Sequence, residues 1–65
     1  MNIQLNGEAC QTEAKTLDLL LVQFEYGDAV VATAVNGEFV AEEQRRKIEI
    51  CDGDAVEILA PMQGG

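Results

Sequence analysis

The chain is 65 residues long, 48% hydrophobic and 25% charged, with a net charge of −8. This size and composition predict one small, marginally stable domain and not a disordered segment. Such an acidic surface repels phosphate backbones and anionic lipid, which argues against nucleic-acid and membrane partners. No apolar run approaches the roughly 20 residues of a membrane-spanning helix, and the N-terminus lacks a signal-peptide pattern, so we expect a cytoplasmic protein.

The N-terminal part of the chain has the pattern of a β-hairpin. Apolar and polar residues alternate from Met1 to Leu5, which predicts a strand with one buried face. Asn6-Gly7 follows, and both residue types tolerate the positive φ angles of a type I′ turn. We therefore expect residues 8–12 to return as a second strand.

A helix is predicted from about Leu17 to Tyr26. Thr16 is a favourable N-cap residue, and Gly27 stands where a glycine commonly ends a helix. Four apolar residues at helical spacing should face a sheet: Leu17, Leu20, Leu21 and Phe24.

The opposite side of this helix carries a second apolar stripe, formed by Leu19, Val22 and Tyr26. Three such residues at helical spacing exceed the scattered apolar residues of an ordinary surface. Two interpretations are equally open. Either loops or a folded-under Tyr26 cover the stripe, or the stripe is a contact face for a partner or a second copy.

The middle of the chain predicts a buried strand and a second hairpin. Residues 29–35 are mostly β-branched and apolar, which is typical of a strand buried on both faces. Asn36-Gly37 repeats the turn signal and leads into a short strand at 38–40. Residues 41–47 are polar and contain the basic run Arg45-Arg46-Lys47, so we expect a solvated loop or one helical turn there.

The C-terminal part predicts a brief extended piece at 48–51, a turn at Asp52-Gly53-Asp54 and a last strand over 55–60. One helix with four or five strands predicts a two-layer α+β domain. The first and last strands have the longest alternating patterns. We expect them to pair in parallel at the centre of the sheet, with the helix covering one face.

The two cysteines, Cys10 and Cys51, are too few for a disulfide framework and lack metal-binding spacing. Both lie in predicted strands, where a reduced thiol behaves as a small apolar side chain.

The chain ends in Met62, Gln63, Gly64 and Gly65. Pro61 before them has no N–H for a ladder and should end the last strand. Because nothing in the last four residues can pack, we expect a folded domain over 1–61 and a mobile tail over 62–65. Two residues without a Cβ would let the terminal carboxylate enter a narrow active site of a partner enzyme.

The predicted order of elements resembles the β-grasp, or ubiquitin-like, fold. Within it, four segments are similar to the ThiS family of sulfur carriers of thiamine thiazole synthesis: Val35 to Val40, Asp52-Gly53-Asp54, Val56 to Leu59 and Gly64-Gly65. The similarity covers essentially the whole chain. The Gly-Gly end alone is shared with the molybdopterin-synthase small subunit and with ubiquitin-like modifiers. The short chain and the Asn36-Gly37 turn favour ThiS.

This resemblance implies that the chain is a protein substrate and not an enzyme, with no metal, no cofactor and no catalytic residue of its own. Consistent with this, the sequence has no histidine and no phosphate-binding loop. An E1-like adenylating enzyme of the ThiF type would activate the Gly65 carboxylate with ATP, and a persulfide sulfur from a donor protein would displace the adenylate. The resulting thiocarboxylate would deliver its sulfur to a thiazole synthase of the ThiG type. Gly65 would carry the sulfur. Gly64 would keep the tail narrow enough for the partner's active site, and Met62 and Gln63 would make it long enough to enter that site.

Two other functions are open from the sequence. The same tail chemistry would serve a carrier for molybdopterin or for tRNA thiolation. A plain interaction domain would carry the Gly-Gly end by coincidence.

The division into domain and tail is testable on the isolated monomer. Backbone amides of residues 62–65 should have order parameters below about 0.6, and those of Val56 to Leu59 should reach about 0.85, because only the strand is packed. NMR relaxation measures both sets. A tail as rigid as the strand would contradict the division.

Overall fold

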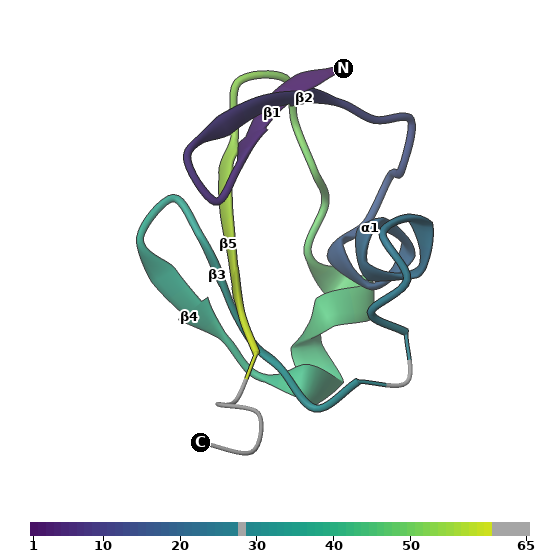
Figure 1. Ribbon diagram of the computed structural model, residues 1–65. Coiled ribbons are helices and arrows are strands. Elements are labelled where there is room, and N and C mark those ends of the chain that lie inside the picture. Colours follow the sequence, from purple (N-terminus) through teal and green to yellow (C-terminus); the bar gives the residue numbers. More distant parts are fainter. Residues whose placement is uncertain (28, 61–65) are drawn as a thin grey trace.

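The computed structural model describes residues 1–27 and 29–60 (Figure 1). These residues form five strands, an α-helix and a 3-10 helix: β1 (Asn2–Leu5), β2 (Glu8–Gln11), α1 (Leu17–Gln23), β3 (Ala32–Val35), β4 (Glu38–Val40), η1 (Glu42–Lys47) and β5 (Ala55–Leu59). The strands join in one mixed sheet in the order β2-β1-β5-β3-β4. Both helices lie on the same side of the sheet, which confirms the predicted two-layer α+β arrangement. Within the described ranges, no helix has the length and apolarity needed to cross a membrane.

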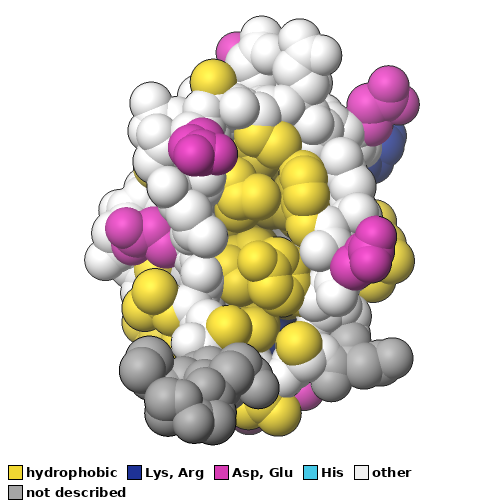
Figure 2. Space-filling model, in the orientation of Figure 1, with side chains coloured by type: hydrophobic (Ala, Val, Ile, Leu, Met, Phe, Trp, Pro, Cys, Tyr) yellow, Lys and Arg dark blue, Asp and Glu magenta, His cyan; other side chains and the backbone are white. Residues whose placement is uncertain are grey.

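The hydrophobic core lies between the sheet and the helices. Leu17 and Leu20 of α1 and Val56 of β5 are almost completely buried. Burial alternates along β5 as the period-2 pattern predicted, with Val56 and Ile58 turned inward. Figure 2 shows apolar side chains as a band along the seam between the sheet and α1. The rest of the buried cluster comes from several elements: Ile3, Leu21, Val40 and Ile50.

β5 is the central strand, and it is held on both sides. It pairs in parallel with β1 and antiparallel with β3, as expected for the first and last strands. Where β1 ends, the side-chain oxygen of Asn6 accepts a hydrogen bond from the backbone N–H of Ile58 at 2.8 Å. On the other side, Asn36 accepts from the N–H of Ala55 at 3.0 Å and donates to the Asp54 carboxylate at 3.0 Å. Two turn side chains therefore extend the hydrogen bonding of β5.

Both Asn-Gly turns adopt the predicted conformation. The φ angles are 52° and 85° at Asn6 and Gly7, and 52° and 84° at Asn36 and Gly37. A type I′ turn needs positive φ at both central residues, and asparagine and glycine reach this region at low cost. In each turn, the backbone of the asparagine helps to reverse the chain, and its side chain forms a hydrogen bond with β5.

The start and the core face of α1 agree with the sequence pattern. Leu17, Leu20 and Leu21 are buried, and Phe24 is partly buried against the core. Thr16 precedes the helix at the N-cap position but makes no side-chain cap. Its hydroxyl donates to the Asp18 carboxylate instead.

The end of α1 differs from the prediction, because the helix is shorter than expected and Gly27 does not end it. Glu25 takes the left-handed conformation, with φ 67°. Its N–H bonds the carbonyl of Val22 at 3.1 Å, and the N–H of Tyr26 bonds the carbonyl of Leu21 at 2.7 Å. These two bonds form a Schellman motif. They offset the conformational free-energy cost of a positive φ at a residue other than glycine.

The strand predicted over residues 29–35 begins only at Ala32. Val30 is 83% exposed, so the expectation of burial on both faces was wrong at this end. The pairing with β5 extends only to Ala32 and Leu59, which leaves the residues before Ala32 outside the ladder. The carbonyl of Val31 is instead bound by a side chain, that of Arg45.

Residues 41–47 are more ordered than a solvated loop. They contain the 3-10 helix η1, so the helical alternative of the prediction is confirmed. Arg45 on this helix is only 9% exposed, so the expectation of a solvated segment was wrong for this residue. Farther on, Gly53 has φ 90° in the predicted turn.

Both thiols are free, and Cys10 in β2 packs against the core as expected. Cys51 lies outside the strands and is exposed, so its predicted place in a strand was wrong.

Truncating the two faces of α1 should have unequal effects on stability. Leu20→Ala is expected to lower the free energy of unfolding by about 2–5 kcal/mol, because the side chain is fully buried. Val22→Ala should change it by about 0.5 kcal/mol or less, because Val22 is 63% exposed. Urea unfolding measures both values. Equal losses would mean that α1 is buried all round.

Candidate functional site at the end of the last strand

The C-terminal end of β5 is the part of the described structure nearest in sequence to the predicted reactive tail. Leu59 is the last strand residue and Ala60 the last described one. The predicted sulfur-carrying residue Gly65 and the tail residues Met62, Gln63 and Gly64 lie outside the described residues. The site is therefore built from the surfaces that surround the end of β5.

The neighbours of this strand end come from β3 and from the residues before it. Leu59 pairs with Ala32, and Ile58 pairs with Thr33. Because the pairing is antiparallel, the segment before β3 lies beside the end of β5, as Figure 1 shows in the lower part of the view. This brings Val31 close to the point where the chain leaves the sheet.

The face of the sheet opposite the helices is apolar near this point. Leu59 is 70% exposed and Phe39 is 74% exposed. Their pairing partners Ala32 and Ala34 on β3 lie between them. We call these four residues the apolar sheet face. Large apolar side chains that gather on an exposed surface are typical of a protein contact site.

One edge of the apolar sheet face is hollowed. A depression of about 490 Å³ is lined by residues before and within β3, by Phe39 and by two residues of η1. Val30, which is 83% exposed, forms part of this lining together with Ala32. The exposed valine and phenylalanine therefore belong to one surface next to the end of β5.

The predicted apolar stripe on α1 is not one continuous exposed surface. Leu19 and Val22 are exposed, at 50% and 63%. Tyr26 is partly buried and packs against the core. The stripe is thus covered at Tyr26 and exposed at Leu19 and Val22, and its role as a partner face stays a prediction.

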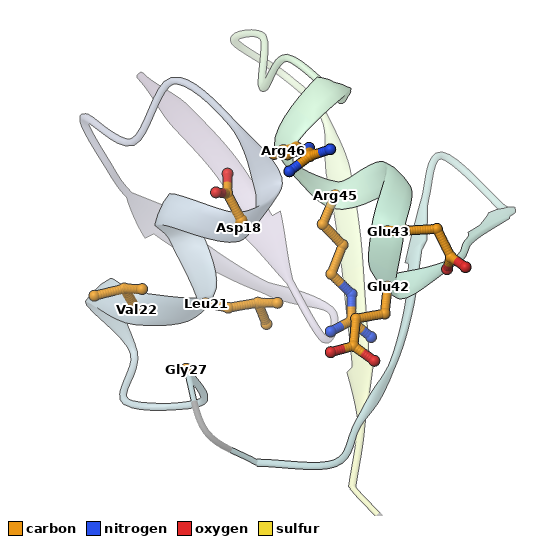
Figure 3. A pocket seen from close by; sticks show the side chains of 8 residues that line it. All are labelled: Asp18, Leu21, Val22, Gly27, Glu42, Glu43, Arg45 and Arg46. Carbon is orange, nitrogen blue, oxygen red and sulfur yellow. The ribbon is translucent and has the colours of Figure 1, made fainter.

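A second depression of about 490 Å³ lies between α1 and η1 (Figure 3). Leu21 and Val22 supply its apolar lining, and the rest is charged or glycine. The other lining residues are Asp18, Gly27, Glu42, Glu43, Arg45 and Arg46. In the described residues, no three Cys, Asp or Glu side chains gather closely enough to hold a metal ion. This depression is a mixed-charge cleft between two surface helices.

The sequence interpretation missed the apolar sheet face, although part of its signal was present. Leu59 alternates with Val56 and Ile58, so the last strand had to place a leucine on its outer face. Phe39 likewise precedes the buried Val40. What the pattern could not supply was the strand order, which brings β4 and β5 to either side of β3.

Comparisons with known proteins agree with this architecture along the whole chain. The profile of the ThiS family matches residues 3–65. A curated relative, the sulfur carrier protein ThiS of Bacillus subtilis (strain 168), is 29% identical over 65 residues, covering 97% of this chain and 98% of the relative.

Solved structures of a thiamine biosynthesis protein from Geobacter metallireducens are similar as well. The crystal structure, described as ThiS, has a TM-score of 0.82 and 33% identity and covers 100% of both chains. The NMR solution structure has a TM-score of 0.83 and 30% identity, covering 100% of this chain and 88% of that one. The fold is thus the β-grasp arrangement of these proteins, as the sequence resemblance implied. The chain belongs to the ThiS family.

Proposed function

We propose that this chain is a cytoplasmic sulfur carrier of thiamine biosynthesis, with Gly65 as the residue that carries the sulfur. The observation that carries the proposal is the family match over residues 3–65, which includes the Gly64-Gly65 end. The Bacillus subtilis relative is itself a sulfur carrier. The chain acts as a co-substrate in this proposal, and its partner enzymes supply the catalytic groups.

The chemistry follows from the poor reactivity of a carboxylate. An E1-like adenylating enzyme of the ThiF type joins the Gly65 carboxylate to AMP and releases pyrophosphate. The sulfur of a donor's persulfide then attacks the carbonyl carbon, and AMP leaves. The C–S bond is then in place, and the S–S bond that the donor brought still links the carrier to the donor. A thiol attacks the donor's inner sulfur and breaks this S–S bond, which leaves the thiocarboxylate on Gly65 and a disulfide between the thiol and the donor. A thiazole synthase of the ThiG type takes this sulfur.

Each part of the chain has a role in this scheme. β5 is fixed by two neighbouring strands and two asparagine side chains, so it provides a rigid base for the residues after it. Met62 and Gln63 give reach, and Gly64 lacks the Cβ that would fill a narrow channel. The net charge of −8 favours partner surfaces that are basic.

The apolar sheet face is the surface that we assign to the adenylating enzyme. It includes Leu59 and therefore lies directly beside the residues that must enter the partner's active site. Leu19 and Val22 belong to α1, which packs on the other face of the sheet. A partner that holds the apolar sheet face is thus better placed to receive the tail than one that holds α1.

The terminal carboxylate can be tested by removing or blocking it. Deleting Gly65, or adding a short C-terminal tag, should abolish ATP-dependent adenylation by a ThiF-type enzyme. Gly64→Val should block it as well, because a branched side chain fills the channel. Pyrophosphate release and intact mass report the reaction.

The matched control carries the same tag at the N-terminus and should be adenylated normally. Urea unfolding should be unchanged in every C-terminal variant, since the changes lie beyond β5. Normal adenylation of a Gly65-deleted or C-terminally tagged chain would refute the proposed chemistry.

The assignment of the docking face predicts an effect on binding. Phe39→Ser should raise the KM of the adenylating enzyme for the carrier about tenfold or more, because truncating a central aromatic contact typically costs over 1 kcal/mol. Val22→Ser removes a similarly exposed apolar group from α1 and should leave KM near its native value. Steady-state kinetics at saturating ATP measure both. An effect of Val22→Ser without one of Phe39→Ser would move the docking site to α1.

A further inference from the structure

Arg45 is buried although it belongs to a run of three basic residues. It is 9% exposed, whereas Arg46 and Lys47, its neighbours on η1, are exposed. Figure 3 shows its side chain extending away from η1 and away from Arg46. An arginine is rarely buried to this degree unless its guanidinium is hydrogen-bonded, so its partners indicate what it does.

The guanidinium of Arg45 binds two points on and just before β3. Its Nε donates to the hydroxyl of Thr33 at 3.0 Å, and its Nη2 donates to the backbone carbonyl of Val31 at 2.6 Å. The Thr33 hydroxyl, which is also buried, donates in turn to the carbonyl of Val40 at 2.8 Å. Arg45 therefore links η1 to β3 and to the segment before β3, and Thr33 extends this link to the end of β4.

These bonds meet the sheet where β5 ends. Thr33 pairs with Ile58, and Ala32 between the two bound residues pairs with Leu59. Val31 lies just outside the ladder, and its carbonyl is held by Arg45. The guanidinium thus binds the backbone that lies beside the chain's exit from β5.

We propose that Arg45 is a positioning residue for the carrier tail. By fixing Val31 and Thr33, it sets the place and direction in which the chain leaves β5 toward a partner's active site. The proposal rests on the sulfur-carrier function and adds a residue distant in sequence from the reactive end. Arg45 touches neither substrate nor cofactor in this role.

A purely stabilising role would not require an arginine. Burying a cation is costly, and an apolar side chain of similar length is often as favourable in the same space. An apolar chain cannot replace two directional, charge-assisted bonds to chosen backbone and hydroxyl oxygens. The geometry therefore favours control of position over gain of stability.

Arg45→Met tests the proposal, with Arg46→Met as a control that removes the same charge from an exposed neighbour. In Arg45→Met, the kcat of adenylation should fall roughly tenfold to a hundredfold, as expected for a misplaced reacting group, while KM stays near native. Arg46→Met should keep both constants. NMR amide shifts of Leu59 and Ala60 should change in Arg45→Met and not in Arg46→Met.

A second variant separates positioning from folding. Thr33→Val keeps the shape of the side chain and removes the hydroxyl that binds Arg45. It should lower kcat in the same direction, after correction for the unfolded fraction measured by urea unfolding. If both variants lose activity only in proportion to unfolding, Arg45 is structural alone and the proposal is wrong.

The remaining outcomes distinguish this inference from the proposed function. If the native chain is adenylated and folded Arg45→Met is adenylated equally fast, the positioning role is refuted while the carrier function stands. If the native chain is not adenylated, the carrier function is refuted, and the positioning role that rests on it is refuted as well.

Discussion

The hydrogen bonding of β5 is the constraint on which the rest of this small domain depends. It is the central strand of the sheet, and it supplies Val56 and Ile58 to the core. β1 pairs with it only as far as Leu5 and Val56, after which the Asn6 side chain continues the bonding at Ile58. Asn36 performs the equivalent task at the other end of the strand, at Ala55. A domain of about this size has little stability to spare, so a central strand with few unpaired groups matters to the whole fold.

A fixed last strand gives the chain a defined exit point next to a contact surface. The outer face of β5 carries Leu59, and the adjacent strands place Phe39 within the same apolar area. From the inner side, Arg45 holds the backbone that flanks this exit. The structure therefore joins three features at one end of the sheet: a strand end, an apolar face and a buried arginine. A carrier protein needs such an arrangement, because its partner must bind the folded domain and accept the tail in its active site at the same time.

Local signals predicted much of this fold because they act over a few residues. The Asn-Gly pairs predicted both hairpins, and alternation located the inward residues of β5.

The local signals failed where contacts between distant residues decide the structure. Glu25 takes the left-handed position in place of Gly27, because two helix-end bonds favour that placement. The burial of Arg45 depends on Thr33 and Val31, which no pattern within the basic run reveals. Likewise, the apolar sheet face exists only once the strand order is known. The assignment of Gly65 as the reactive residue is based on the Gly-Gly sequence and on the family match.

The most direct test of the account is the intact mass of the chain purified from its own host without a C-terminal tag. A sulfur carrier should be present partly as a species heavier by the exchange of one oxygen for sulfur, and fragmentation should localise the change to Gly65. Treatment with an alkylating reagent under mild conditions should modify that species at its C-terminus. A single unmodified mass in cells that are actively making thiamine, or added sulfur found only on Cys10 or Cys51, would contradict the account.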